Sequence, residues 1–287
     1  MTNNISAIFE LAQGGVSGKD HRPLATGSQD SSAHLINLES MIAVVCDGCG
    51  SEPHSEVGAQ VGARLFVQSL AKQLTTDLSS EEDARRILNR ARDGALRLIS
   101  LLADNMGSNF MQIINNYFLF TMVGMAVYRD KALFFSFGDG VIIINGETIQ
   151  LGPFPDNKPP YMSYHLIRDR LETSLPPDYL DFRIHRLMPI EQLNHCLLGT
   201  DGLHHFMAAA GEKLPGRNEP VGPIDQFWTQ DRFFRNPDMV RRRLFMTNRE
   251  VITVPTGNSS LHRELGHLDD DTTLIVVRRK TNTKETT

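Results

Sequence analysis

Residues 32–48 read SAHLINLESMIAVVCDG, and this stretch decides which fold the sequence favours. It predicts two strands. The second, residues 41–46, is nearly all apolar, which is typical of a strand buried on both faces of a sheet. The strand stops at Asp47-Gly48-Cys49-Gly50, where two glycines allow a tight turn. A buried strand with a carboxylate at its end is therefore the first element of the predicted fold.

Two long helices are predicted after this turn. Residues 55–74 carry apolar side chains at helical spacing, together with small residues that permit close packing on a sheet. Residues 80–106 form a second amphipathic stretch, and its SSEED start is typical of a capping box with acidic residues in the first turn. Both helices are expected to cover a sheet.

The pattern changes to strands from residue 117. The segments YFLFTMVGMAVY, ALFFSF and VIIING predict three successive strands, and further strands are expected at residues 181–187, 195–199 and 273–277. The proline-rich residues 152–163 are expected to form a surface loop, and residues 203–250 to be helical or irregular. Helices in pairs and strands in hairpins, with little βαβ alternation, favour an α+β fold of largely antiparallel sheets covered by helices.

The chain shows no convincing linker, so residues 1–287 are expected to form a single domain with a frayed polar tail from about residue 279. Hydrophobic residues make up 40% and charged residues 22%, which is ordinary for a globular protein. The net charge of −5 argues against a nucleic-acid partner, and no apolar run is long enough for a membrane span. Three cysteines and a start without a basic, apolar leader favour a cytoplasmic location.

Four aspartates lie at the ends of predicted strands. Asp47 follows IAVVC, Asp139 follows LFFSFG, Asp201 follows CLLGT, and Asp270 precedes DTTLIVV. Such carboxylates converge when their strands lie side by side, and because like charges repel, the cluster then requires cations. All-oxygen ligands indicate Mg²⁺ or Mn²⁺ rather than zinc. An Asp-Gly at a strand end is also a common hairpin turn, so the pattern alone leaves a shared metal site and a set of ordinary turns as alternatives.

Six motifs follow one another along the chain: GKDH with GSQD (18–21 and 27–30), AVVCDGCGSEPHSEVGA (43–59), a strand threonine at Thr121, FGDG (137–140), LLGTDGL (197–203) and DDTTLIVV (270–277). In this order they resemble the motifs of the metal-dependent protein serine/threonine phosphatases of the type 2C family, in particular its bacterial branch. A lone Asp-Gly is a weak signal, whereas this series covers nearly the whole chain. The resemblance implies a four-layer α/β/β/α sandwich of two mainly antiparallel sheets flanked by helices.

The resemblance also implies roles for the strand-end aspartates. Asp47 would bridge two metal ions, with the Gly48 carbonyl as a further ligand. Asp201 and Asp270 would complete the shell of one of these ions. The implied cofactors are two Mn²⁺ or Mg²⁺ ions in a core site.

Two further aspartates have supporting roles in this interpretation. Asp30 would bind or orient water on the second ion, and Asp139, with help from Asp201, would hold a third, looser ion. The implied activity is hydrolysis of phosphoserine and phosphothreonine on proteins by metal-activated water, without a covalent phosphoenzyme. The implied partners are a phosphorylated protein and a cognate serine/threonine kinase in signalling. An inactive phosphatase-like module that binds phosphorylated partners and a hydrolase of small phosphate esters remain as alternatives.

The sequence departs from the family pattern in two places. Cys49 stands where many members carry a histidine that is a candidate general acid, and His21 or His54 are the other candidates for that role. The arginine that many members use to bind phosphate has no clear equivalent. Arg22 is the nearest candidate, and Gln29 with the aspartate after it stands where others have Glu-Asp.

Three remaining features each carry two interpretations. Cys46-x-x-Cys49 is a redox motif or simply a buried strand residue followed by the metal motif. The arginines at residues 241–243 form a solvated helix face or contact a phosphoprotein. The stretch near Lys158 falls where the family has its substrate flap, and a simple surface loop is equally consistent.

Overall fold

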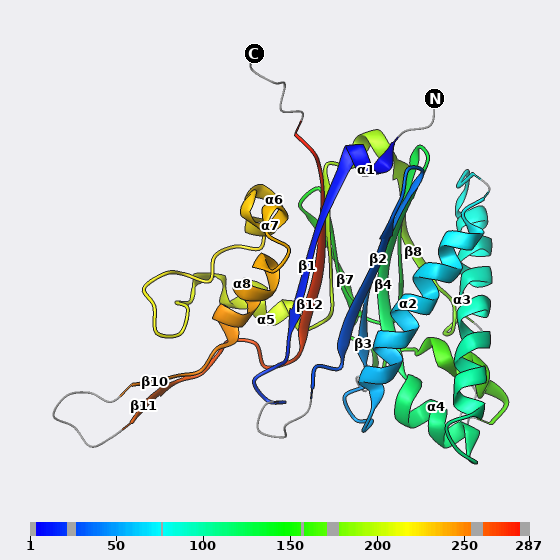
Figure 1. Cartoon of the computed structure of the whole chain (residues 1–287), viewed down its shortest axis with the longest axis horizontal. Helices are drawn as coiled ribbons and strands as arrows, with labels where there is room; N and C mark the ends of the chain where they lie inside the picture. The colour runs from blue at the N-terminus through cyan, green and yellow to red at the C-terminus, as the bar shows by residue number, and fades with distance from the viewer. Residues whose placement is uncertain are drawn as a thin grey trace.

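The computed structural model describes residues 4–21, 27–75, 77–155, 158–170, 178–253 and 261–281. Two five-stranded antiparallel sheets stand face to face at the centre of the molecule (Figure 1). The strand orders are β2-β3-β4-β5-β8 and β1-β12-β9-β6-β7, and a short β10–β11 hairpin projects away from both sheets. The strands are β1 (Phe9–Val16), β2 (Asp30–Ile36), β3 (Ser40–Gly48), β4 (Phe120–Tyr128), β5 (Lys131–Phe137), β6 (Gly140–Ile144), β7 (Glu147–Leu151), β8 (Arg183–Pro189), β9 (His195–Gly199), β10 (Val251–Thr253), β11 (His262–Glu264) and β12 (Thr272–Arg279).

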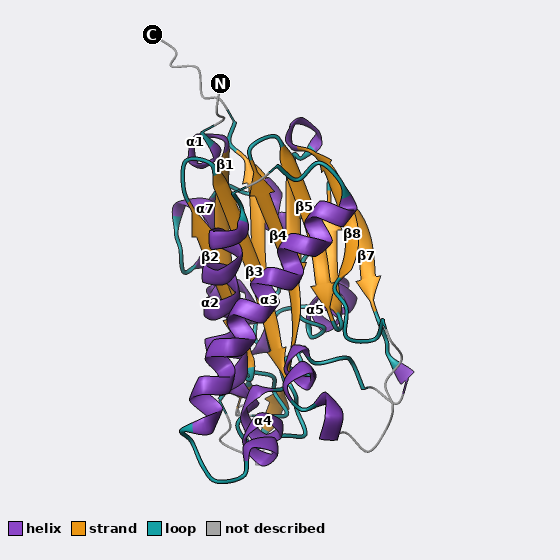
Figure 2. Ribbon diagram, turned by 90° about the vertical axis from the view of Figure 1, so that its right-hand side faces the viewer, coloured by secondary structure: helices purple, strands orange, loops and turns teal. Residues whose placement is uncertain are grey.

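Helices cover the outer face of each sheet, which gives four layers (Figure 1). Figure 2 shows α2 and α3 lying in front of the strands. Helices α2, α3 and α4 pack on the sheet that contains β3, and α5 to α8 pack on the sheet that contains β12. The helices are α1 (Ile5–Ile8), α2 (Ser55–Gln73), α3 (Glu81–Asp104), α4 (Phe110–Phe118), α5 (Leu203–Ala208), α6 (Gln226–Thr229), α7 (Arg232–Arg235) and α8 (Met239–Asn248). The predicted α+β fold, a four-layer α/β/β/α sandwich, is confirmed.

Strand β3 shows why the sequence folds in layers. Its side chains alternate between two hydrophobic cores. Met41, Ala43 and Val45 lie in the core between the two sheets. Ile42, Val44 and Cys46 lie in the core between this sheet and its helices. All six are at most 1% exposed. Because successive side chains of a strand point to opposite faces, a strand of apolar residues must be covered on both sides. Each of its larger side chains contributes roughly 1.5–3 kcal/mol when fully buried.

Helices α2 and α3 lie where the apolar periodicity predicts them. The Ser80 hydroxyl accepts a hydrogen bond from the Asp83 backbone N–H at 3.1 Å, so Ser80 caps α3. A cap of this kind contributes about 1 kcal/mol. Glu81, Glu82 and Asp83 lie in the first turn, where acidic side chains interact favourably with the helix dipole. The predicted capping box is confirmed.

Several elements differ from the expectation. Residues 117 and 118, predicted to open a strand, end helix α4 instead, because Ile114 and Phe118 bury one face of that helix. Strands β1 and β7 and the β10–β11 hairpin are not predicted by the pattern. In β1 only Phe9 and Ala12 are buried, so the apolar signal is weak. Strand β12 continues to Arg279, and the predicted frayed tail falls mostly on residues 282–287, which lie outside the described residues.

Strand ends from both sheets meet at one end of the sandwich. In the first sheet, Asp30 lies opposite Asp47, and Asp47 lies opposite Thr121. In the second sheet, β9 pairs with β12, and the Thr200 backbone N–H donates to the Thr273 carbonyl at 3.0 Å. This end of the fold therefore carries the aspartates that the sequence singles out. No helix within the described ranges is long and apolar enough to cross a membrane.

Candidate functional site

A cleft of about 540 Å³ opens where the strand ends of the two sheets meet. Strand β3 and the turn after it form one wall, and the loops after β9 and before β12 form another. The polar and aromatic residues that line it include Asp47, Asp139, Asp201, Asp270, His21, Gln29, Cys49, Thr121, Lys158, Tyr161 and Tyr164. The structure thus brings the four strand-end aspartates into one cavity.

Asp30 lies behind the cleft wall, opposite Asp47 in the β2–β3 pair. Its side chain is 8% exposed, and its Oδ2 accepts a hydrogen bond from the Thr200 hydroxyl at 2.7 Å. Its Oδ1 is buried and has no hydrogen-bond partner among the described atoms. Burial raises the pKa of Asp30 well above its usual range, although the Thr200 hydrogen bond opposes this. A buried oxygen without a partner is costly, so it indicates a position for water or a cation.

Asp47 stands at the electrostatic centre of the site. Burial raises the pKa of Asp47 well above its usual range, and the charges of Asp30, Asp201, Asp270 and Asp139 raise it further. Within the described residues, no lysine or arginine forms an ion pair with any of these five carboxylates. Five acids that repel one another must be neutralised by protons or by bound cations.

Asp139 is held by a turn that needs glycine on both sides. Gly138 and Gly140 have φ angles of +98° and +130°, a region that side chains with a Cβ rarely adopt. A Cβ at position 138 would lie 2.6 Å from Thr121 Cβ, so the turn packs directly on β4. Burial, and then the charge of Asp201, raises the pKa of Asp139 to about 6, whereas a hydrogen bond from Thr121 acts in the opposite direction. The threonine of the strand motif therefore supports this aspartate.

Asp201 and Asp270 come from two loops that touch. A Cβ on Gly202 would overlap the Asp271 carbonyl oxygen, so only glycine allows this approach. Burial, followed by the charge of Asp201, raises the pKa of Asp270. The loop contact therefore brings two acidic side chains together at the edge of the cleft.

These residues fit a divalent cation by their chemistry, since carboxylates and a carbonyl are the ligands that Mg²⁺ and Mn²⁺ take. Asp30 offers an unpartnered buried oxygen, and Asp47 is surrounded by four further acids. The carboxylate oxygens of these aspartates do not all lie within coordination distance of a single point. Among the described residues, the one group of three ligand atoms within 4.8 Å of one another is His21, Asp270 and Asp271. The other aspartates surround the cleft at larger separations.

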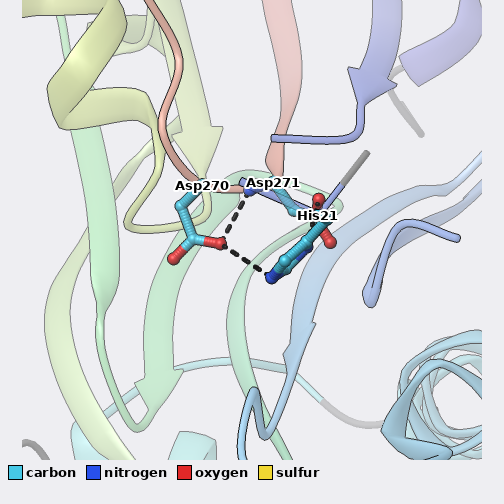
Figure 3. Close-up of side chains that lie close together, drawn as sticks. All are labelled: His21, Asp270 and Asp271. Atoms are coloured by element: carbon cyan, nitrogen blue, oxygen red, sulfur yellow. Dashed lines mark hydrogen bonds and ion pairs between the residues drawn. The ribbon is translucent and has the colours of Figure 1, made fainter. Parts of the chain in front are cut away.

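Asp271 is a residue at the candidate site that the sequence reasoning missed. It is 2% exposed, and its carboxylate accepts hydrogen bonds from the backbone N–H groups of Gly18 at 2.7 Å and Gln29 at 2.6 Å. It also contacts His21 Nδ1 at 2.9 Å (Figure 3). The acidic run at residues 269–271 is the only local signal, and it does not show which member binds the distant N-terminal loop.

Two of the three candidates for proton donation lie in the cleft, and the third does not. Cys49 and His21 line the cleft, whereas His54 is exposed at the start of α2 and stacks on Tyr117 at a centroid distance of 4.7 Å. Cys49 Sγ lies 3.2 Å from the Ser51 hydroxyl. Burial, and then a hydrogen bond with Cys49, raises the pKa of Tyr161. His54 is therefore the weakest of the three candidates.

The remaining sequence features are placed as follows. Arg22 lies outside the described residues. Cys46 is fully buried in β3, and both it and Cys49 are free thiols. Gln29 supports the turn after β3, since its Nε2 donates to the Ser55 hydroxyl at 2.7 Å.

The three arginines at residues 241–243 differ in their exposure to solvent. Arg241 and Arg242 are exposed and pair with Asp238. Arg243 is only 10% exposed and pairs with Glu219, so the expectation of a solvated helix face is wrong for Arg243. Its guanidinium also donates to the Val221 carbonyl at 2.7 Å, so it supports the fold.

Lys158 is the only lysine or arginine among the described residues that line the cleft. The hydroxyl of Tyr179 donates to its carbonyl at 2.7 Å, and its own N–H donates to the Pro155 carbonyl at 3.1 Å. The backbone of Lys158 is therefore held through both its N–H and its carbonyl.

Comparison with known proteins gives a consistent result. The sequence model of the family described as protein phosphatase 2C matches residues 17–244. Among solved structures, the serine/threonine phosphatase Stp1 from Staphylococcus aureus is similar, with a TM-score of 0.53, 14% identity, and 98% of each chain covered. A bacterial serine phosphatase with a single substitution has a TM-score of 0.51 and 14% identity, over 95% of this chain and 99% of that one. At this identity the structural likeness concerns the fold. No curated protein sequence gives a significant match.

Proposed function

The chain belongs to the protein phosphatase 2C family of metal-dependent serine/threonine phosphatases, and from that premise we propose that it uses two divalent ions in the acidic cleft to hydrolyse phosphoserine and phosphothreonine on proteins. The observation that carries the proposal is Asp47, which is surrounded by four acids and has no lysine or arginine partner in the described residues. A cognate serine/threonine kinase and a cytoplasmic setting belong to the same proposal. We also propose that residues 1–287 form a single domain, because β1 near the start of the chain pairs with β12 near its end.

The residues present would hold the ions as follows. Asp47 would bind both ions of the core site, with the Gly48 carbonyl as a further ligand, and Asp201 and Asp270 would complete the shell of one. Asp30, whose Oδ1 has no partner among the described atoms, would bind or orient water on the other. When bound, the two ions would lower the pKa of a shared water and offset charge on the phosphoryl oxygens.

A third ion is a separate part of the proposal. Asp139 and Asp201 would hold it more loosely, because Asp139 comes from a turn rather than from the end of a buried strand. The metal identity is proposed as Mn²⁺ or Mg²⁺ from the oxygen ligands.

The chain's own side chains position the reacting groups. The hydrogen bond from the Thr200 hydroxyl would orient Asp30, and Thr121, which opposes the raised pKa of Asp139, would support that carboxylate. Tyr161 and Tyr164 line the cleft together with Lys158, and their rings would help to exclude water from a bound ester. Cys49 lies in the wall of the same cleft, and its thiol would give a proton to the leaving serine or threonine oxygen.

A second candidate function is a phosphatase-like module that binds phosphorylated partners without turnover. Cys49 in the place of a histidine favours it, as does the presence of one lysine and no arginine among the described lining residues. Hydrolysis of small phosphate esters is the third candidate. The cleft volume of about 540 Å³ falls in the range of small-molecule sites.

The test is Mn²⁺-dependent hydrolysis of p-nitrophenyl phosphate and of a phosphothreonine peptide, with the wild type compared with Asp47→Asn. Activity on both substrates that is lost in the variant supports the proposal. No activity on either substrate despite bound metal would refute it in favour of the binding module. Activity on the aryl ester alone indicates either a small-molecule hydrolase or a missing proton donor.

Cys49→His separates these last two explanations. An alkyl leaving group needs a proton, and a general acid contributes roughly 10²–10⁴-fold. If the donor is what is missing, the variant should gain at least about tenfold on the peptide and little on the aryl ester. A variant that still leaves the peptide intact would indicate a small-molecule substrate.

A further inference from the structure

His21 lies between two aspartates at the edge of the cleft (Figure 3). Its Nδ1 is 2.9 Å from Asp271 Oδ1, and its Nε2 is 4.0 Å from Asp270 Oδ1. One ligand atom from each of these three residues lies within 4.8 Å of the others. The imidazole is 21% exposed, so a small ion in the cleft can reach it.

Asp271 determines which nitrogen of the ring carries the proton. Its carboxylate already accepts the backbone N–H groups of Gly18 and Gln29. An ionised carboxylate has no proton to donate, so Nδ1 of His21 must donate to it. In the neutral ring, Nε2 then carries a lone pair on the side of Asp270. A carboxylate that fixes the tautomer in this way is the usual partner of a metal-bound histidine.

The separation between Nε2 and Asp270 Oδ1 suits a shared ion. Nitrogen and oxygen ligands bind divalent metals at about 2.0–2.2 Å, so two ligands on one ion lie at most about 4.4 Å apart. The observed 4.0 Å falls within that limit. Asp270 is also held in place, because its Oδ1 accepts a hydrogen bond from the Asp271 backbone N–H at 2.8 Å.

We propose that His21 supplies a nitrogen ligand to the divalent ion held by Asp270, and that Asp271 orients the imidazole. The proposal rests on the metal centre proposed above and adds a ligand that is not an aspartate. Imidazole suits transition-metal ions, whereas Mg²⁺ prefers oxygen ligands and water. The position shared by His21 and Asp270 is therefore selective for Mn²⁺ over Mg²⁺.

The test uses the full chain, stripped of metal and titrated with Mn²⁺ in the absence of substrate. Pulsed electron paramagnetic resonance of the bound Mn²⁺ should show coupling to an imidazole ¹⁴N nucleus in the wild type. His21→Ala should abolish that coupling. It should also weaken Mn²⁺ binding by roughly 10- to 100-fold, with a smaller loss of Mg²⁺ affinity.

The matched control is His205→Ala, because His205 Nε2 lies 3.8 Å from Asp269 on the other side of the same acidic run. This variant should keep the coupling. Coupling that is absent from the wild type, persists in His21→Ala, or disappears in His205→Ala instead would overturn the proposal. Circular dichroism of each variant would check that it is folded. Since no substrate is used, these results do not depend on whether the protein is an active phosphatase.

Discussion

Two groups of aspartates at the same end of the molecule differ in what stabilises them. Asp47, near the end of β3, and Asp139, in the turn between β5 and β6, line the cleft, where burial and like charges raise the pKa of both. Asp269 and Asp271 belong to the loop before β12, and the protein itself provides their partners. Lys19 pairs with Asp269 and lowers the pKa of that carboxyl, and two backbone N–H groups and His21 bind Asp271.

The two groups therefore differ in whether the protein itself compensates their negative charge. Asp269 and Asp271 have partners within the fold, whereas the acids in the cleft lie among other acids. Both groups have the same side chain and lie close together, so sequence alone gives them equal weight. Asp270 stands between them, since burial and Asp201 raise its pKa while its backbone belongs to the loop. The following predictions test this division.

The largest effect is expected from Asp47→Asn. Loss of the central carboxylate should reduce metal-dependent turnover by roughly 10²-fold or more, because a metal ion contributes several kcal/mol to the transition state. The metal-free variant should nevertheless unfold at a higher temperature than the wild type, by roughly 2 °C or more for each kcal/mol of repulsion removed. Scanning calorimetry and a phosphatase assay measure the two effects. Asp269→Asn is the control, and a metal-free Asp47→Asn protein that is less stable than the wild type would contradict the division.

Asp271→Asn should destabilise the metal-free protein, whereas Asp47→Asn should stabilise it. One of the two carboxylate oxygens becomes an N–H donor that faces a backbone N–H, and a buried donor without an acceptor costs about 1–3 kcal/mol. Urea unfolding measures the loss. The adjacent Asp270→Asn is the matched control and should be neutral or stabilising, because burial and Asp201 raise the pKa of Asp270. Equal destabilisation by both variants would show that the two neighbours do not differ.

The pH dependence of the metal-free protein should reveal Asp139. Its folded pKa of about 6 lies above the ordinary value of 3.8, so the folded state holds a proton that the unfolded state has lost between these values. Stability should therefore fall as the pH rises from about 4 to about 6, by about 1–3 kcal/mol, and stay reduced above that range. In Asp139→Asn this contribution is absent, so the stability of the variant relative to the wild type should rise from about pH 4 to about pH 6 and stay constant above that range. A difference that does not change with pH would refute the assignment.

The smallest effect is expected from Lys19→Met. The Lys19–Asp269 pair is partly exposed, at 30% and 47%, and exposed pairs contribute about 0.2–1 kcal/mol. The loss should shrink in high salt because screening weakens exposed pairs. Urea unfolding at low and high salt measures it. A loss of several kcal/mol would mean that the loop acids depend on this lysine far more than their exposure indicates.

The fold was largely predictable because its central strands are distinctive. The all-apolar run at residues 41–46 and its terminal Asp47 indicate a buried strand with a polar end, and local residues suffice for that conclusion. The layer arrangement came from the resemblance to the family. The last two residues of α4 were assigned to a strand because the apolar residues at the end of this helix run directly into those of β4 without a polar break.

The supporting shell of the site was less predictable, since it depends on contacts between distant parts of the chain. His21 and Asp271 are 250 residues apart, and Thr200 and Asp30 are 170 residues apart. No local pattern indicates which member of the 269–271 run faces inward. The choice depends on the approach of Gly202 and Gly18 to this loop, which is visible only in the folded chain.

The position of β12 between β1 and β9 has a consequence for biosynthesis. The last long strand of the described chain is an interior strand of its sheet, so β1 has no partner until residues 272–279 have left the ribosome. Pairing between segments so far apart in sequence is slow to form. We therefore expect nascent chains to carry the β3 half of the site without the β12 half. Activity would then appear only after synthesis has passed this strand, which keeps incomplete chains from acting on phosphoproteins.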